Sequence, residues 1–429
     1  MPSKKRRGKI GAIASACAII TCSACQTTDE ASERQGIHEV FGSARHGTPV
    51  PVSVSEVAWK WNSPEEDPVF EVIPVPTGAV AHTSSGAFAI DTLTGETLWS
   101  YGFSESTDDV EPTPDGSRVV VSSEQGIAVL DAASGKIIVE EHEKREEYEL
   151  SLESLGIPLN SGLVSMSEEN GQGLLTMDPW EGSGEPWEAE ASCSDGGPAG
   201  EVRQALTTPT AFIVVQDCAD GDQEVVSFSP ESGEELWRSS RDEDLGVSTD
   251  LDLAGTGEVL VHQDISTLRG TLIVDASTGE VIADDLEDSL DNDLLRVLPD
   301  GYLAVREDRD GNLSYELREF SGKVIERTLV DREEAGSAIT GYLPLSGALV
   351  KLSPTGEGND VLQPVVHGWG TEHGGERITV PFEVVAPETL SLREVDRVLG
   401  PGAFEAVPGA VILREHSSDG TTAALVGLH

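Results

Sequence analysis

Basic residues are scarce in this chain, which holds 28 lysines and arginines against 77 aspartates and glutamates, for a formal net charge of -49. Such an excess of negative charge repels nucleic acid and anionic lipid headgroups, so we expect no nucleic-acid partner. The acidic residues are concentrated in runs such as Glu140–Glu153 and Asp284–Asp293. These runs could form a docking face for a basic partner or for divalent cations. The simpler interpretation, which we favour, is solubility or adaptation to salt.

Motifs for catalysis are also missing from the sequence, which has no HExxH pair, no GxSxG elbow and no phosphate-binding loop. Asp308–Asn312 begins like a calcium loop, with Glu319 as the terminal ligand, but its glycine falls at the fourth position instead of the sixth. A hairpin turn explains this segment better. His367, Glu372 and His373 could ligate a metal, but a solvated loop is favoured. We predict no catalytic residue, no metal and no cofactor.

Long apolar runs are absent except near the N-terminus, where a basic segment at residues 4–9 precedes the fifteen-residue stretch Ile10–Ala24. This stretch is too short for an ordinary membrane-spanning helix, so it predicts a signal peptide over residues 1–24. The sequence before Cys25 resembles a bacterial lipobox, although Cys22 stands where an aliphatic residue is usual. We therefore predict a diacylglyceryl group on Cys25. Ordinary secretion and an uncleaved anchor are the alternatives.

Lipidation would anchor the protein in the bilayer at the extracytoplasmic face of the cell membrane. Residues 25–54 are polar and include two prolines near their end, so they predict a flexible tether before a folded domain at residues 55–429. Cleavage of the signal would leave two of the five cysteines, Cys193 and Cys218. An even pair in an exported chain favours a disulfide, with two separate buried thiols as the alternative.

A short motif recurs along the rest of the chain. A glycine followed by glutamate or lysine closes a turn after an apolar, strand-like run, and the glycines lie 40 to 53 residues apart. This period is typical of four-stranded propeller blades. The glycines are Gly95, Gly135, Gly184, Gly233, Gly279, Gly322 and Gly375.

Each position of the motif has a structural role. An aspartate at the start of the turn can cap the turn with its carboxylate, and the glycine supplies a positive φ. A tryptophan after the turn would pack between neighbouring blades. The aspartates are Asp91, Asp131 and Asp275, and the tryptophans are Trp99, Trp187 and Trp237.

These repeats, most fully Ala89–Trp99, resemble the pyrroloquinoline-quinone-like propeller repeat of quinoprotein dehydrogenases and of the outer-membrane assembly lipoprotein of Gram-negative bacteria. The resemblance covers most of residues 68–380 and implies the fold more than the function, since the family contains enzymes and scaffolds. The quinoproteins place their cofactor over a tryptophan, with an aspartate base and calcium ligands. Trp180, Trp187 and Trp369 lack such companions here, and the adjacent cysteine pair of several dehydrogenases is absent.

We therefore expect an all-β, eight-bladed propeller of the non-enzymatic branch. The strand-like segment Glu56–Trp61 would complete the C-terminal blade and close the ring. Seven blades are the alternative if Gly336–Phe382 is an embellishment.

The expected function is that of a monomeric, lipid-anchored module that binds or scaffolds an unknown protein of the bacterial cell envelope. A quinone- and calcium-dependent oxidoreductase and an extracytoplasmic ligand-binding or sensor domain are the alternatives.

Overall fold

The computed structural model describes residues 36–429 with gaps. The gaps are 43–47, 65–66, 105, 143–149, 153, 170–171, 201, 219–222, 240–248, 254–256, 264–271, 284–291, 299–300, 308–312, 331–341, 355–360, 371–376, 383, 386–402 and 417–421. The predicted signal peptide, Cys25, the Asp308–Asn312 loop, Glu372, His373 and Gly375 lie outside the described residues. No helix in the described part of the chain has the length and apolar character needed to cross a bilayer.

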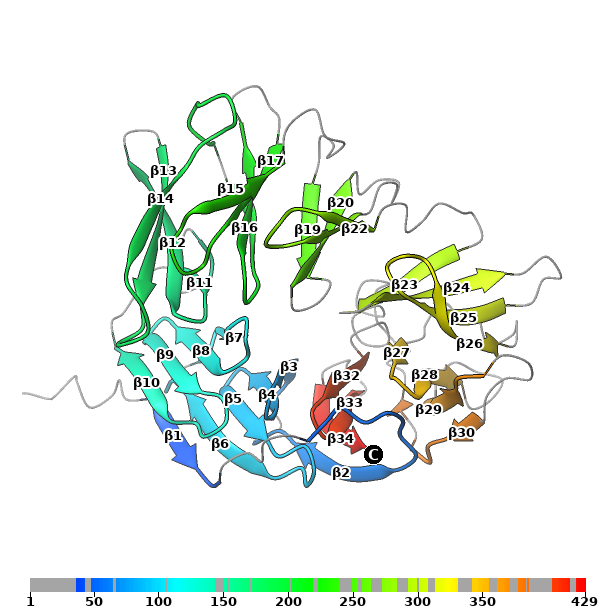
Figure 1. Ribbon diagram of the computed structural model, residues 1–429. Helices are drawn as coiled ribbons and strands as arrows, with labels where there is room; N and C mark the ends of the chain where they lie inside the picture. The colour runs from blue at the N-terminus through cyan, green and yellow to red at the C-terminus, as the bar shows by residue number, and fades with distance from the viewer. Residues whose placement is uncertain are drawn as a thin grey trace, which may run out of the picture.

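The protein is all-β, and its described strands form eight antiparallel sheets that follow one another around a common centre (Figure 1). The first sheet contains β3 (Val69–Val75), β4 (Gly78–Thr83), β5 (Gly86–Ile90), β6 (Thr97–Gly102) and β1 (Ile37–Val40). The second contains β7 (Asp109–Pro112), β8 (Arg118–Ser123), β9 (Gly126–Asp131) and β10 (Ile137–Glu141). The third contains β11 (Ile157–Pro158), β12 (Gly162–Glu169), β13 (Gln172–Pro179) and β14 (Trp187–Ala191). The fourth contains β15 (Val202–Thr207), β16 (Phe212–Asp217), β17 (Gln223–Phe228) and β18 (Glu235–Arg238).

The second half of the chain continues the same pattern. The fifth sheet contains β19 (Thr249–Leu253), β20 (Glu258–Gln263), β21 (Leu272–Asp275) and β22 (Val281–Ala283). The sixth contains β23 (Asn292–Leu298), β24 (Gly301–Glu307), β25 (Leu313–Arg318) and β26 (Val324–Val330). The seventh contains β27 (Tyr342–Pro344), β28 (Ala348–Pro354), β29 (Val361–Gly368) and β30 (Arg377–Thr379), with β31 (Val384–Val385) on β29. The eighth contains β32 (Phe404–Val407), β33 (Ala410–His416), β34 (Thr422–Leu428) and β2 (Val57–Asn62).

The strand sequences explain which strands lie inside each sheet. The two central strands are nearly continuous apolar runs, such as β4 and β9, because neighbouring sheets cover both of their faces. Outer strands such as β14 alternate between buried and exposed side chains, as expected where one face meets water. The apolar core is therefore divided into layers between successive sheets.

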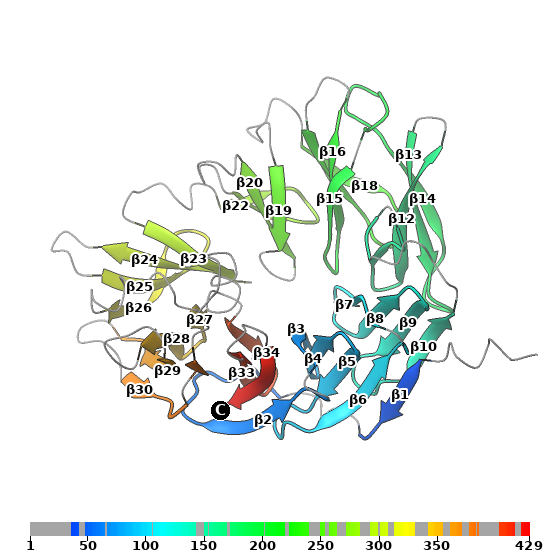
Figure 2. The ribbon, with the colours of Figure 1, turned by 180° about the vertical axis from the view of Figure 1, so that it is seen from behind.

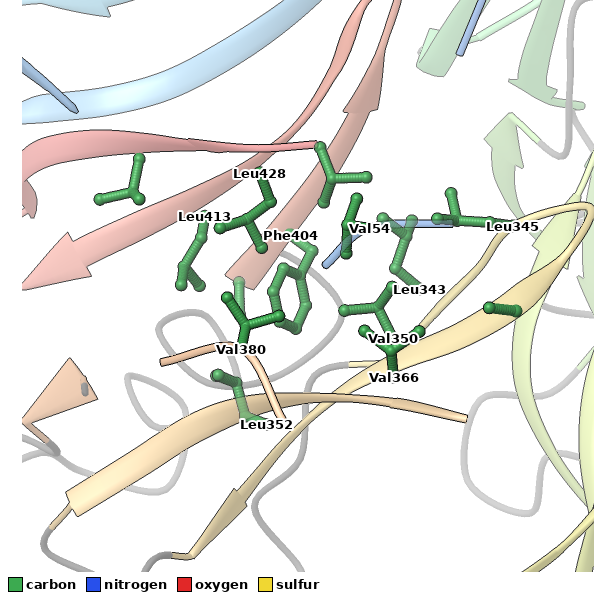
Figure 3. Close-up of a cluster of buried hydrophobic side chains, with 14 of the residues drawn as sticks. Val54, Leu343, Leu345, Val350, Leu352, Val366, Val380, Phe404, Leu413 and Leu428 are labelled. Carbon is green, nitrogen blue, oxygen red and sulfur yellow. The ribbon is translucent and has the colours of Figure 1, made fainter. Parts of the chain in front are cut away.

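The two ends of the chain meet in the eighth sheet. β2 pairs with β34, with Trp61 opposite Leu425, and both views place the two strands side by side (Figures 1 and 2). Beside this pair, a cluster of buried side chains fills the space between the seventh and eighth sheets. Figure 3 shows Val54, Leu343, Leu345, Val350, Leu352, Val366, Val380, Phe404, Leu413 and Leu428 in this cluster. Val54 joins residues almost 300 positions later, so this layer depends on both ends of the chain.

Part of the segment expected to be a flexible tether is seated on the folded domain. We call residues 36–42 and 48–54 the strap. β1 pairs with β6 along the outer edge of the first sheet. Pro49 then accepts a hydrogen bond from Gly409 N at 3.0 Å, and Val52 accepts one from Gly347 N at 2.8 Å. The structure thus differs from the predicted boundary at residue 55, because the outer edge of a sheet offers unpaired backbone groups to any nearby extended segment.

The repeat turns show why the motif contains an aspartate and a glycine. Asp91 Oδ1 accepts a hydrogen bond from Leu93 N at 2.9 Å, and Asp131 Oδ1 and Asp275 Oδ1 accept equivalent bonds from Ser134 N and Thr278 N, each at 2.8 Å. The turn glycines have φ values between 68° and 79°, which other residues rarely adopt. They are Gly95, Gly135, Gly233, Gly279 and Gly322. In the longer third turn this conformation falls on Gly182, at φ 77°, instead of the predicted Gly184.

Four tryptophans fasten one sheet to the next in the same way. The indole of Trp99 donates from Nε1 to Ala132 O of the second sheet at 3.0 Å and covers Gly135, where a Cβ would lie 2.4 Å from the ring. We call this arrangement a tryptophan joint. Trp187 and Trp237 form the same joint with the next sheets, and Trp59 on β2 forms it between the eighth and first sheets. The glycine is therefore required for close approach as well as for its φ.

A disulfide joins the two cysteines that remain after the predicted signal. Cys193 follows β14 in the third sheet, and Cys218 follows β16 in the central hairpin of the fourth sheet. Next to the disulfide, Glu224 accepts a hydrogen bond from Ser194 N at 3.0 Å. Glu224 also forms an ion pair with Arg238, whose Nη1 lies 2.6 Å from the carboxylate. The bond thus crosses between two sheets and has a structural role.

Candidate functional site

A pocket of about 620 Å³ opens where the inner strands of four sheets end near the centre of the ring. The ends of β3, β7 and β15 and the short strand β11 form most of its wall, and the turn between β32 and β33 adds Pro408. Its lining is Pro74, Val75, Pro76, Glu111, Pro112, Thr113, Pro114, Asp115, Gly116, Leu150, Ile157, Ala205, Leu206, Thr207, Thr208, Pro209 and Pro408. The opening lies on the same side of the ring as the glycine turns, which we call the turn face.

Six prolines give this pocket a fixed and largely apolar wall. A proline ring holds φ near -65° and carries no N–H, so the wall offers few hydrogen-bond donors and changes shape little. The second-sheet turn is also tied to the third sheet, because Asn160 Oδ1 accepts a hydrogen bond from Asp115 N at 3.0 Å and Asn160 O accepts one from Arg118 Nη1 at 2.6 Å. The rim is therefore rigid before any ligand arrives.

Glu111 brings an unusual carboxyl group into this wall. Burial, together with the neighbouring carboxylates Asp109 and Glu71, raises the pKa of Glu111 to about 8. Asp115 at the rim behaves in the opposite way. Although burial acts to raise its pKa, hydrogen bonds from Ser117 N and the Thr113 hydroxyl, each 2.9 Å long, lower it below the ordinary value. The pocket thus combines a neutralised acid inside with an ionised acid at its mouth.

No residue of this pocket belongs to the motifs predicted from the sequence. The predicted repeat residues lie in turns and joints, and Cys193 and Cys218 lie in the disulfide, so none of them lines the pocket. The available signal was the segment Asp109–Pro112, an inner strand whose two acidic residues flank the buried Val110. Acids at alternate positions lie on one face of the strand, so Asp109 and Glu111 face the same neighbouring sheet.

The other candidate residues have structural surroundings. Trp187 forms a tryptophan joint, and Trp369 Nε1 donates to Leu345 O at 2.9 Å. His367 is buried on β29. Among the described residues, the one group with metal-ligand proximity is Cys193, Cys218 and Glu224, but the disulfide removes both thiolates as ligands.

A second cavity, about 410 Å³, lies beside the strap and is lined in part by Phe41, Phe88 and Leu98.

Successive four-stranded sheets, glycine turns and tryptophan joints define the class of the fold as a propeller of pyrroloquinoline-quinone-like repeats. Residues 55–218 match the family of outer membrane protein assembly factor BamB, which confirms the predicted resemblance over this part of the chain. The match ends before the fifth sheet begins. No curated protein matches the chain.

Several solved structures are similar to this protein at low identity. BamB from Moraxella catarrhalis is 13% identical, with a TM-score of 0.44, and the match covers 88% of this chain and 100% of that chain. Dihydro-heme d1 dehydrogenase NirN is 10% identical, with a TM-score of 0.42 and coverage of 81% and 78%. The WD40 domain of SCAP from fission yeast is 11% identical, with a TM-score of 0.41 and coverage of 88% and 96%. Similarity at this level carries no argument about function.

Proposed function

We propose that the protein is a monomeric scaffold of the bacterial cell envelope, lipid-anchored at Cys25 on the extracytoplasmic face of the membrane. It binds a segment of a partner envelope protein in the pocket on its turn face. It carries no catalytic residue and uses no cofactor. The observation that carries the proposal is the rigid, mostly apolar pocket, because a preformed concave site with few polar groups is suited to binding.

The architecture of this scaffold is an eight-bladed ring, with each of the eight sheets as one blade. Two features of the closure support it. β2 supplies the outer strand of the last blade, and Trp59 Nε1 on this strand donates to Thr92 O of the first blade at 2.7 Å. The closing joint therefore has the same geometry as the joints inside the ring. Gly336–Phe382 then contributes a blade of its own, since β27 to β30 of the seventh sheet lie within that part of the chain.

The match of residues 55–218 to a family of assembly factors supports a binding role over catalysis. A propeller offers partners a broad ring face, while its closed edges limit unwanted strand pairing. The acidic composition fits this role, because it disfavours nucleic acid and non-specific adsorption to anionic lipid. The diacylglyceryl group would then supply the membrane affinity that the protein surface lacks.

Photo-crosslinking in native membranes tests the proposal. A photoreactive amino acid replaces Thr207, which is half-buried in the pocket, and in the matched control it replaces Lys323, which is exposed on the sixth sheet. We expect one reproducible crosslinked protein from position 207 and none from position 323. Crosslinks from neither position, or the same set from both, would contradict a pocket-binding scaffold.

Mass spectrometry of the N-terminal peptide from the same membranes tests the anchor separately. We expect a diacylated peptide that begins at Cys25. An unmodified N-terminus would remove the lipid anchor from the proposal and leave the crosslinking result to stand or fall by itself.

A further inference from the structure

Three carboxyl groups lie near one another at the wall of the pocket, and one of them, Glu111, lines it. Glu111 and Asp109 lie on β7, and Glu71 lies on the neighbouring inner strand β3. Glu111 itself lines the cavity. The remaining lining residues from β11, β15 and the Pro408 turn carry no charge, and Asp115 at the rim is the other acidic lining residue. A ligand that enters the pocket therefore meets apolar surface, the ionised Asp115 at the rim and, at Glu111, a carboxyl group that ionises most readily beside a cation.

We propose that the pocket binds a short extended segment of a protein partner that carries a lysine or arginine, and that this cation pairs with Glu111. The inference rests on the proposed function, since it specifies the chemistry of the partner at the same site. The other possible occupant, an uncharged apolar segment, is an outcome of the test below.

The charge of the pocket selects a cation. Ionisation of a carboxylate that faces two others in a partly buried wall is unfavourable. An incoming cation offsets both the repulsion between the carboxylates and the free energy lost when they are desolvated. A neutral or acidic segment offers no such compensation. The net charge of -49 on the chain also attracts a basic partner during diffusional encounter.

The shape of the pocket selects a short segment over a folded surface. Its volume of about 620 Å³ lies in the range of roughly 300 to 1,000 Å³ that is usual for pockets of small ligands. The rigid proline wall cannot open to admit a helix or a sheet edge. An extended peptide can place one long side chain inward while its backbone crosses the rim, where Thr207 provides a polar group.

Pairing with a cation makes the binding depend on pH. In the free protein, burial and the carboxylates of Asp109 and Glu71 hold the pKa of Glu111 at about 8, so the group is largely protonated at pH 6. A bound cation favours the ionised form, so binding releases a proton. Affinity therefore rises with pH up to about 8 and is constant above it. Asp115 is already ionised throughout this range because its pKa is lowered.

Selection from a random heptapeptide library on the full mature chain, at pH 8, tests the chemistry. We expect lysine and arginine to be enriched at one position on the native protein. The enrichment should be lost with Glu111→Gln and retained with the control Glu96→Gln, an acid in the second cavity. Uncharged apolar peptides from the native protein, or basic peptides from both the native protein and Glu111→Gln, would overturn the proposal.

Fluorescence anisotropy with the best selected peptide then tests the pH dependence. We expect affinity to increase by about tenfold or more between pH 6 and pH 8 for the native chain and to stay constant for Glu111→Gln. Equal pH dependence in both proteins would contradict pairing at Glu111. Circular dichroism of each variant checks that it is folded. None of these readouts depends on lipidation or on a crosslinked partner, so failure here differs from failure of the proposed scaffold.

Discussion

Between the first and second sheets, the indole of Trp99 covers Gly135 and donates to Ala132 O. Between the fifth and sixth sheets, buried charge lies in the corresponding layer. Glu316 on β25 is fully buried, and it lies opposite Ala304, whose side chain belongs to the cluster around Ile273 of the fifth sheet. Glu316 forms ion pairs with Arg318 and Arg327. The same packing problem is thus solved by one large side chain in one region and by several charged side chains in the other.

The difference explains where the repeat can be recognised. A tryptophan joint needs one tryptophan and one glycine at fixed positions, so it leaves a regular signal in the sequence. The charged layer takes its residues from two strands, β25 and β26, with no constant spacing. The family match lies in residues 55–218, which include three of the four joint tryptophans, and the fourth, Trp237, follows shortly after it. It does not extend to the sixth sheet.

The largest effect should come from Trp99→Ala, which removes a fully buried indole from a joint. We expect the free energy of unfolding to fall by about 4 kcal/mol. Thermal unfolding followed by circular dichroism measures the loss. Trp369→Ala in the seventh sheet is the matched control, because that side chain is only partly buried and bonds within its own sheet. Equal losses of stability in the two variants would show that the tryptophan joint stabilises the protein no more than a partly buried tryptophan does.

A pair of glycine substitutions separates close approach from backbone strain. Gly135 and Gly322 have similar φ values, 68° and 79°. A Cβ on Gly135 would lie 2.4 Å from Trp99, whereas the nearest atom to a Cβ on Gly322 is 4.0 Å away. We expect Gly322→Ala to cost about 1 kcal/mol, from strain alone. Gly135→Ala should cost about 3 kcal/mol, because overpacking is added. Urea denaturation compares the two losses of stability. Similar losses would mean that the Trp99 indole can move aside without cost.

In the charged region, Glu316→Gln should destabilise the protein by about 2 kcal/mol, because two arginines lose their buried partner. The estimate is below that for a fully buried pair, since Arg327 is partly exposed. Urea denaturation at pH 7 measures the effect. Glu319→Gln, which breaks an exposed ion pair with Lys323, is the control and should change stability little. A neutral result for Glu316→Gln would show that packing alone holds this layer.

The smallest effect has the opposite sign. The folded-state pKa of Glu111 is about 8, against an ordinary value of 4.5, so the folded protein binds the extra proton between these two values. The contribution of this protonation to the free energy of unfolding is therefore fully present below pH 4.5 and is lost as pH rises through 8. We expect Glu111→Gln to leave stability nearly unchanged at pH 4.5 and to raise it by at least about 1 kcal/mol at pH 8.5. Thermal unfolding at the two pH values checks this, and a lower midpoint for the variant at pH 8.5 would refute it.

Much of the fold could be predicted from the sequence, because its turns are local. Asp91 and Gly95 bend the chain through contacts within a few residues, so each copy of the motif is sufficient to predict its own hairpin. The candidate site could not be predicted in this way. The pKa of Glu111 depends on Glu71, on a different sheet, and the pocket wall includes Pro408, almost 300 residues further along the chain.

The N-terminal segment shows the same division. Its polar composition predicted a flexible tether, and its residues alone do not identify β1 as a strand. The strap forms because β6 presents an open edge and because Gly409 and Gly347 lie where Pro49 and Val52 can accept their N–H groups. The sequence by itself determined the hairpins, the period of the repeat and the tryptophan and glycine of each joint, since these act over short distances. Only the tertiary structure decided the pocket, the pKa of Glu111 and the path of the strap, because each depends on side chains or sheet edges that folding brings together.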